Sequence, residues 1–251
     1  MTWQPPETFE EKLKRKFIPP QLYMIYRVGK EMRIGEKEIK LLPFLVDRNK
    51  AAVDVGAHKG VWSYQLSKVC AEVYAFEPNP KLYPVLEQNI KGRANPRNIA
   101  LSNFTGTAEL RIPRGRKGFS NQGGSLSEVK VSANYKSVEV GAEKLDNLGI
   151  QNIGFMKVDV EGHELAVLEG ARETLARDKP VMIVEMEEAH AKRPIEELTS
   201  AVEAYGYDAF AMKNGILTRF WNIDMEKHHR HAKKRDDYIF NFVFLPSKVT
   251  R

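Results

Sequence analysis

Residues 51–60 read Ala-Ala-Val-Asp-Val-Gly-Ala-His-Lys-Gly, and residues 75–79 read Ala-Phe-Glu-Pro-Asn. The first stretch predicts an apolar strand that ends in a glycine turn, and the second predicts a strand that ends at a carboxylate. Glycines let backbone N–H groups and the start of the following helix come close to a ligand. The carboxylate of Glu77 can accept hydrogen bonds from both hydroxyls of a ribose. Together the two stretches predict a nucleoside site.

The residues of the turn favour S-adenosylmethionine over a dinucleotide. A dinucleotide site usually has Gly-x-Gly-x-x-Gly, whereas this turn has His58 within Gly56-x-x-x-Gly60. The carboxylate of Asp54 would repel a pyrophosphate, but it suits a ligand with an ammonium or sulfonium group. S-adenosylmethionine has both groups, so we expect it rather than NAD. His58 either lines the pocket or only sets the spacing of the backbone.

The length of the chain predicts one domain, residues 46–251, preceded by an extension, residues 1–45, that caps the domain or covers a substrate. No run of 18 apolar residues exists to span a membrane, and the first residues lack the apolar segment of a signal peptide. Cys70 is the single cysteine, so no internal disulfide can form. We therefore expect a protein of the reducing cytoplasm.

Basic stretches leave the nature of the partner open. The net charge of +6 permits an anionic partner and is also ordinary for solubility. The loop 113–128 is rich in Arg, Gly and Ser, so it is either a clamp for an acidic substrate or a solvated loop. The tract 227–235 is a basic surface loop, an anion site or an adventitious metal binder. The basic stretch 10–17 is typical of a cap, although such segments also lie on membranes.

From residue 50 onward, strand and helix patterns alternate. Continuous apolar runs predict buried parallel strands, and Asn214-Gly215 predicts a hairpin. We therefore expect an α/β sandwich with a mainly parallel sheet and an antiparallel edge. The predicted strands cover residues 51–55, 72–76, 98–101, 107–112, 136–140, 154–159, 181–186, 207–212, 216–221 and 239–245, and the predicted helices cover residues 61–69, 80–90, 164–176 and 194–205.

Carboxylates gather at one edge of the predicted sheet. Asp54, Glu77, Asp159 and Glu185 stand at the carboxyl ends of core strands, where ligands of open α/β sheets bind, and Glu161 lies two residues beyond Asp159. Such a gathering favours a bound cation or a proton transfer.

Three of these carboxylates, and the nearby His163, also have a structural interpretation. Asp159 can cap a helix, Glu161 can be solvated, and His163 is either a general base, with a pKa near neutrality, or a surface residue at a helix start. Glu185 can pair with a basic side chain, either Lys157 or Arg193.

Several ordered motifs resemble those of one enzyme family. They are residues 53–60, 75–80 and 98–102, the stretch Lys-Val-Asp-Val-Glu-Gly-His-Glu at 157–164, and residues 184–185 and 241–246. The chain resembles the FkbM-type methyltransferases, a branch of the class I S-adenosylmethionine-dependent enzymes. The resemblance implies a Rossmann-like sandwich with a mainly parallel, seven-stranded sheet whose last strand is antiparallel.

The resemblance also implies roles for individual residues. Family members are generally O-methyltransferases that act on hydroxyls of sugars, polyketides or other natural products. The glycine turn should shape the pocket for methionine and ribose, and Glu77 should bind the ribose hydroxyls. The expected cofactor-binding residues are Asp54, Gly56, His58, Gly60, Glu77, Asn79, Asn98, Ala100, Ser102 and Asp159.

We therefore expect an O-methyltransferase that uses S-adenosylmethionine and a hydroxyl acceptor on a sugar, glycan or other natural product, including anionic ones. In the expected mechanism, His163 or Glu161 takes the hydroxyl proton, and Asp159 orients the cofactor or the base. In a variant, Asp159 and Glu185 hold Mg²⁺ or another divalent metal that acidifies the hydroxyl.

Three other functions are weighed against this one. A nucleic-acid methyltransferase would explain the basic charge, but the Asn/Asp-Pro-Pro-Tyr signature of base methylation and an added nucleic-acid-binding module are absent. A non-catalytic protein could use the same scaffold, but the acidic edge argues against it. His58 and Asp54 argue against a nicotinamide-dependent oxidoreductase.

Overall fold

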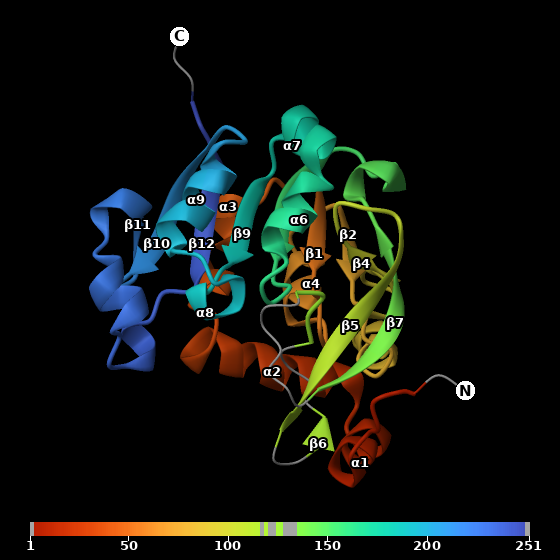
Figure 1. Ribbon diagram of the computed structural model, residues 1–251. Helices are drawn as coiled ribbons and strands as arrows, with labels where there is room; N and C mark the ends of the chain where they lie inside the picture. The colour runs from red at the N-terminus through yellow and green to blue at the C-terminus, as the bar shows by residue number, and fades with distance from the viewer. Residues whose placement is uncertain (1–2, 116–117, 120–123, 128–134, 249–251) are drawn as a thin grey trace.

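The computed structural model describes residues 3–115, 118–119, 124–127 and 135–248. Its central sheet has eight strands: β1 (Ala51–Val55), β2 (Glu72–Phe76), β3 (Asn95–Arg97), β8 (Ile153–Val158), β9 (Val181–Glu185), β10 (Tyr207–Lys213), β11 (Ile216–Arg219) and β12 (Asn241–Pro246). They are ordered β11-β10-β12-β9-β8-β1-β2-β3 across the sheet (Figure 1).

The directions of the strands confirm the predicted sheet. Strands β3, β2, β1, β8 and β9 run parallel to one another, whereas β12 pairs antiparallel with both β9 and β10. The predicted hairpin adds β11 as an eighth strand beyond the expected seven. Asn214 and Gly215 both have positive φ angles, as a tight hairpin turn of this kind requires.

Helices cover both faces of this sheet. One face is covered by α2 (Pro20–Ile34), α3 (Leu42–Leu45), α4 (Val61–Leu66) and α5 (Tyr83–Ile90), and the other by α6 (Glu164–Glu169), α7 (Arg172–Asp178) and α9 (Ile195–Glu203). The remaining helices are α1 (Phe9–Phe17) and α8 (Glu188–Ala191), with short turns η1 (Lys37–Leu41), η2 (Leu145–Leu148), η3 (Phe220–Asn222), η4 (Glu226–Arg230) and η5 (Arg235–Asp237).

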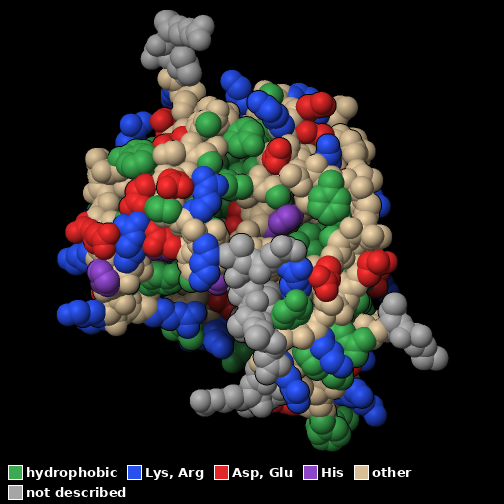
Figure 2. All heavy atoms as spheres, viewed as in Figure 1, with side chains coloured by type: hydrophobic (Ala, Val, Ile, Leu, Met, Phe, Trp, Pro, Cys, Tyr) green, Lys and Arg blue, Asp and Glu red, His purple; other side chains and the backbone are tan. Residues whose placement is uncertain are grey.

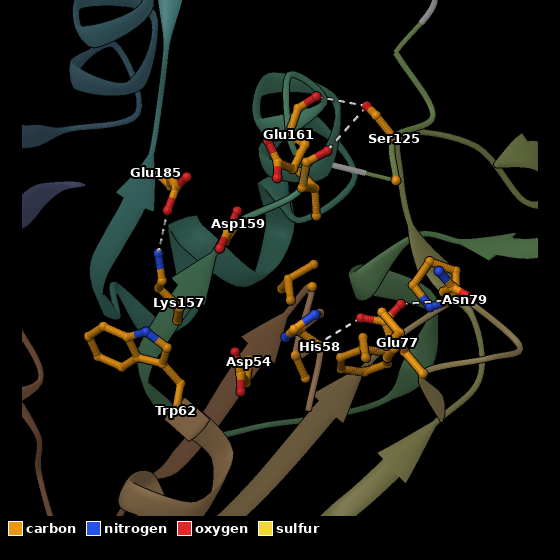
Figure 3. A pocket seen from close by; sticks show the side chains of 18 of the residues that line it. Asp54, His58, Trp62, Glu77, Asn79, Ser125, Lys157, Asp159, Glu161 and Glu185 are labelled. Carbon is orange, nitrogen blue, oxygen red and sulfur yellow. Dashed lines mark hydrogen bonds and ion pairs between the residues drawn. The ribbon is translucent and has the colours of Figure 1, made fainter. Parts of the chain in front are cut away.

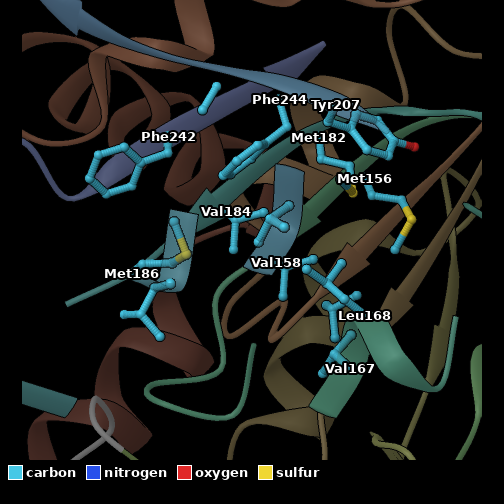
Figure 4. Packing of buried hydrophobic residues seen from close by; sticks show 14 of the residues in the cluster. Met156, Val158, Val167, Leu168, Met182, Val184, Met186, Tyr207, Phe242 and Phe244 are labelled. Atoms are coloured by element: carbon cyan, nitrogen blue, oxygen red, sulfur yellow. The ribbon is translucent and has the colours of Figure 1, made fainter. Parts of the chain in front are cut away.

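The core explains why the central strands read as continuous apolar runs. Both faces of β8 and β9 are covered, so Met156, Val158, Met182 and Val184 are buried on one side, while Phe155 and Ile183 are buried on the other. Figure 4 shows the first group packed with Val167 and Leu168 of α6 and with Phe242 and Phe244 of β12.

A second, smaller sheet stands beside the first, and it corrects the predicted third strand over 98–101. The sheet contains β4 (Ala100–Leu101), β7 (Tyr135–Glu143), β5 (Gly106–Gly115) and β6 (Gly118–Phe119), in that order. Strand β3 ends at Arg97, and the side chain of the next residue, Asn98, donates hydrogen bonds to the carbonyl groups of Glu77 and Pro78. Ala100 and Leu101 then pair with β7 instead.

The helix predicted over 164–176 is two helices, because Asp146 starts the second one. Both oxygens of Asp146 accept hydrogen bonds from backbone N–H groups at the start of α7, those of Glu173 and Thr174. Such capping satisfies N–H groups that a helix leaves without partners at its first turn.

The residues before β1 form part of this packing. Met24 and Val28 of α2 are buried against the face of the sheet that α4 also covers, together with Ile39 and Leu42. Periodicity did not predict α2 as a helix. Among the described residues, no helix is both long and apolar enough to cross a bilayer.

Candidate active site

A cavity of about 500 Å³ opens where β1, β2, β8 and β9 end (Figure 3). Ten of the predicted site residues line it: Asp54, Gly56, His58, Glu77, Asn79, Ala100, Asp159, Glu161, His163 and Glu185. The other three, Gly60, Asn98 and Ser102, do not line it. The topology thus brings together side chains from four strands, as the sequence predicted.

The glycine turn lets β1 and β8 approach each other at the cavity. Gly56 has φ +79°, and a Cβ atom on it would stand 1.8 Å from the carbonyl oxygen of Asp159. Gly60 has φ +87°, and a Cβ there would meet Ile90 at 2.8 Å and Leu86 at 2.9 Å. Gly56 therefore shapes the floor of the cavity, whereas Gly60 seats the start of α4 against α5.

Glu77 is fixed by the backbone at the edge of the cavity. Its two carboxylate oxygens accept hydrogen bonds from the backbone N–H of His58 at 2.8 Å and of Asn79 at 2.9 Å. Burial raises the pKa of Glu77 to about 7, and the nearby carboxylates of Asp54 and Asp159 add to this. A carboxylate has about four acceptor positions, so two remain for a ligand.

Asp54 is the second buried carboxylate of the turn. It accepts a hydrogen bond of 2.5 Å from the hydroxyl of Ser63, and burial raises the pKa of Asp54 to about 6. An ammonium or sulfonium group nearby would favour the charged form of this carboxylate.

Glu161, in the loop after β8, has a histidine partner from α8 that the sequence did not reveal. Glu161 has φ +59°, and its carbonyl oxygen accepts a hydrogen bond of 2.7 Å from Ser125. Its carboxylate lies 3.3 Å from Nδ1 of His190, whose Nε2 is 4.0 Å from the carboxylate of Glu187. All three side chains line the cavity. An imidazole held between two carboxylates is suited to accept a proton.

His163 faces a different neighbour. Its Nε2 lies 2.9 Å from the hydroxyl of Ser102, and burial lowers its pKa, which favours the neutral imidazole at physiological pH. Ser102 does not line the cavity itself, but it contacts His163, which does.

Lys157 is the buried centre of a charged network between β8 and the residues before β1. Its ammonium group donates a hydrogen bond of 2.8 Å to Asn241 and lies 3.3 Å from Glu36 and 3.9 Å from Glu185. The indole N–H of Trp62 also donates to Glu36, at 2.7 Å. Figure 3 shows Lys157 between Trp62 and Glu185.

The network includes Glu185, one of the two residues of the predicted metal site, and that site stays a prediction. Glu185 is an ion-pair partner of Lys157, which was the alternative interpretation of that residue. Within the described part of the chain, no three or more His, Cys, Asp or Glu side chains are arranged to hold a metal ion.

Two cationic side chains beside the glycine turn were also not predicted from the sequence. Arg27 of α2 and Lys59 both line the cavity. Arg27 pairs with Glu31 at 3.0 Å, but its buried Nε has no hydrogen-bond partner among the described residues. Burial lowers the pKa of Lys59, and the positive charge of Arg27 contributes in the same direction. Two cations held in this way are suited to an anionic group of a ligand.

The structure tests the two basic stretches unequally. Residues 116–117, 120–123 and 128 of the loop 113–128 lie outside the described residues, so both interpretations of this loop stay open. The tract 227–235 is largely structural: Arg230 pairs with Glu188, Glu196 and Glu226, and His228 and His229 are buried. Only Arg235 of this tract lines the cavity.

Comparisons with known proteins agree with this geometry. The family model described as "Methyltransferase FkbM domain" matches residues 54–209. Hexuronic acid methyltransferase AglP of Haloferax volcanii is 28% identical over 167 residues, which cover 64% of this chain and 65% of AglP. Methyltransferase sdnD of Sordaria araneosa is 27% identical over 194 residues, which cover 64% of this chain and 74% of sdnD.

A solved structure shows the same fold. The FkbM methyltransferase of Methylobacillus flagellatus superposes with a TM-score of 0.50 at 15% identity, and the superposition covers 90% of this chain and 54% of that one. The chain thus spans somewhat less than two thirds of AglP and about half of the Methylobacillus protein.

Proposed function

The chain belongs to the FkbM methyltransferase family, and on that premise we propose that it transfers a methyl group from S-adenosylmethionine to an oxygen of a sugar, glycan or related acceptor. The observation that carries the proposal is the carboxylate of Glu77. It is buried at the cavity and oriented by two backbone N–H groups, with acceptor positions left for ribose hydroxyls.

The lining of the cavity fits the other parts of the cofactor. Asp54 offers a negative charge for the ammonium group, and Lys59 with Arg27 offers positive charge for the carboxylate of the methionine moiety. Apolar side chains next to Glu77, those of Ile99, Ala100 and Leu101, suit the faces of an adenine. When bound, S-adenosylmethionine supplies an electrophilic methyl group on its sulfonium.

The acceptor would lie where β8 and β9 end. In our proposal, Nε2 of His190 takes the proton of the acceptor hydroxyl, while Glu161 holds Nδ1 and stabilises the imidazolium that forms. Asp159 borders both parts of the cavity and would orient the cofactor. His163 is the alternative base, but its Nε2 is directed to Ser102.

A sugar acceptor is supported by the name of one relative. AglP is a hexuronic acid methyltransferase. We extend the sugar class, but not the particular sugar, to this chain.

Calorimetry tests the cofactor half of the proposal. Replacing Glu77 by Ala removes up to two hydrogen bonds to a charged group, so the affinity for S-adenosylmethionine and S-adenosylhomocysteine should fall roughly 100-fold. Glu72→Ala is the matched control, because Glu72 is an exposed carboxylate at the start of β2, the strand that Glu77 follows. Equal affinities of the Glu77→Ala variant and the wild type would refute the site.

Transfer itself is tested with purified protein, S-adenosylmethionine and a panel of free and linked sugars, including uronic acids. We expect S-adenosylhomocysteine to form together with a sugar that has gained one methyl group. Binding of the cofactor without transfer to any oxygen acceptor would refute the acceptor class and leave the cofactor site intact.

A further inference from the structure

Helix α1 presents its apolar stripe to solvent. Phe9, Leu13 and Phe17 recur every four residues and therefore share one face of the helix. Phe9 is 76% exposed and Phe17 is 68% exposed. Of the nine residues of α1, none is buried. An amphipathic helix ordinarily buries this face, so its exposure needs a partner to explain it.

The polar side of α1 is the side that attaches to the protein. Glu11 forms an ion pair of 3.1 Å with Lys81, whose side chain is almost completely buried. Arg15 pairs with Glu7, which begins the segment, at 2.7 Å. A capping box between Thr8 and Glu11 fixes the start of the helix. The ion pair with Lys81 therefore holds the polar face inward, and the apolar stripe faces outward.

Helix α2 is attached differently, because it carries apolar side chains on both of its faces. Met24 and Val28 face the core, whereas Leu22, Ile25 and Tyr26 are at least 60% exposed. Nine of the thirteen large apolar side chains that are exposed among the described residues lie between residues 9 and 44. One of the nine, Phe44, belongs to α3, which lies apart from α1 in Figure 1. We call the other eight the N-terminal surface: Phe9, Leu13, Phe17, Ile18, Leu22, Ile25, Tyr26 and Ile34.

The same segment is basic. Residues 9–44 contain nine Lys and Arg residues against five Glu residues and no Asp, so they carry +4 of the net charge of +6. Lys12 and Lys16 are exposed on α1, and the ammonium group of Lys16 lies 5.5 Å from the centre of the Phe17 ring. Figure 2 shows hydrophobic side chains beside Lys and Arg at the lower end of the molecule, where Figure 1 places α1.

We propose that the N-terminal surface docks on an anionic lipid bilayer. Bulky apolar side chains that enter the acyl boundary, with Lys and Arg at the level of the headgroups, are the two features that a helix lying in a membrane interface needs. The positive charge favours this occupant over a second copy, whose identical surface would repel it. Helix α2 also lines the cavity with Arg27 and Glu31, so docking would bring the cavity close to the bilayer.

Vesicle sedimentation tests this proposal independently of methyl transfer. The full chain should bind vesicles of phosphatidylcholine with about 30% phosphatidylglycerol, bind pure phosphatidylcholine much less, and lose binding as salt is raised. Phe9→Ser combined with Phe17→Ser should lower the partition coefficient roughly tenfold or more. Lys12→Glu with Lys16→Glu should lower it for the anionic vesicles only.

Matched controls distinguish docking through the N-terminal surface from non-specific adsorption of the protein to vesicles. Ile216→Ser removes an apolar side chain that is 68% exposed on β11, and Arg172→Glu reverses an exposed charge on α7, at the opposite end of the molecule in Figure 1. Both should bind vesicles like the wild type, and circular dichroism checks the fold of each variant. Unchanged binding by the double Phe variant would overturn the proposal. A wild-type dimer that this variant converts to a monomer would also overturn it, in favour of self-association.

Discussion

The ammonium group of Lys157 lies 3.3 Å from the carboxylate of Glu36, which joins the middle of the sheet to the segment before β1. Burial alone would oppose a charge on Lys157, but the carboxylates of Glu36, Asp159 and Glu185 outweigh it and raise the pKa of Lys157 above its ordinary value. The segment before β1 is therefore held to the central sheet by an ion pair as well as by apolar packing.

Replacing Lys157 by Met should destabilise the protein by about 3–5 kcal/mol, because it leaves buried carboxylates without their cation. Urea denaturation measures this loss as a shift of the midpoint. Lys179→Met is the control, since Lys179 is exposed at the end of α7. A loss below about 1 kcal/mol would show that the ion pair is unimportant.

Gly56→Ala should cost more stability than Gly92→Ala, although both residues have similar positive φ angles of +79° and +70°. Both variants place a side chain in the left-handed region, at about 1–2 kcal/mol. Only at Gly56 does the new Cβ strike the carbonyl oxygen of Asp159, whereas at Gly92 it meets nothing within 4 Å. Equal thermal shifts in the two variants would contradict the close approach of β1 and β8.

The affinity for S-adenosylmethionine should rise with pH and level off above about pH 7. Burial raises the pKa of Glu77 to about 7 and that of Asp54 to about 6 in the unliganded protein. The ligand needs the ionised carboxylates, so below these values binding must release protons. Calorimetry in buffers of different ionisation enthalpy counts the released protons, and no release at pH 6 would contradict this account.

The raised pKa values of Glu77 and Asp54 affect the stability of the folded protein in the opposite sense: stability falls as pH rises. The folded protein holds protons on Glu77 and Asp54 that the unfolded chain releases nearer pH 4, so these groups make the unliganded protein less stable as pH rises to about 7. Ligand binding should reverse this trend, which thermal melts with and without S-adenosylhomocysteine can follow.

His190→Asn should lower kcat by about 10²–10⁴-fold, which is the usual contribution of a general base, and leave the affinity for S-adenosylmethionine unchanged. Glu161→Gln should lower kcat less, because it orients His190 without taking the proton. His163→Gln is the informative comparison. If that variant loses most of kcat while His190→Asn keeps it, His163 is the base and our assignment is wrong.

Residues near the carboxyl ends of the parallel strands were predictable because topology alone brings them together. Asp54, Glu77, Asp159 and Glu185 follow from the strand pattern, since parallel neighbours end at one edge of the sheet. The local motif of glycines predicted the turn equally well, because only a few residues tolerate its φ angles.

Tertiary partners were not predictable in this way. Glu36 and Asn241 meet Lys157 from opposite ends of the chain. Asn241 begins one of the family motifs, but no local pattern pairs it or Glu36 with Lys157. Helix α2 was not predicted, because apolar residues occupy both of its faces. Met24 faces the core and Ile25 faces solvent, so the apolar residues do not recur with the period of one helix face. His190 lies in a short helix after β9, away from any motif.

The position of β12 has a consequence for how the chain folds during synthesis. β9 and β10 follow one another in sequence, but in the sheet they are joined only through β12, which the ribosome makes after both. The β10–β11 hairpin therefore has no place in the sheet until β12 has emerged, and the Lys157–Asn241 hydrogen bond forms at the same late moment. Such non-local pairing slows folding, and until β12 arrives the edge of β9 has unpaired N–H and C=O groups.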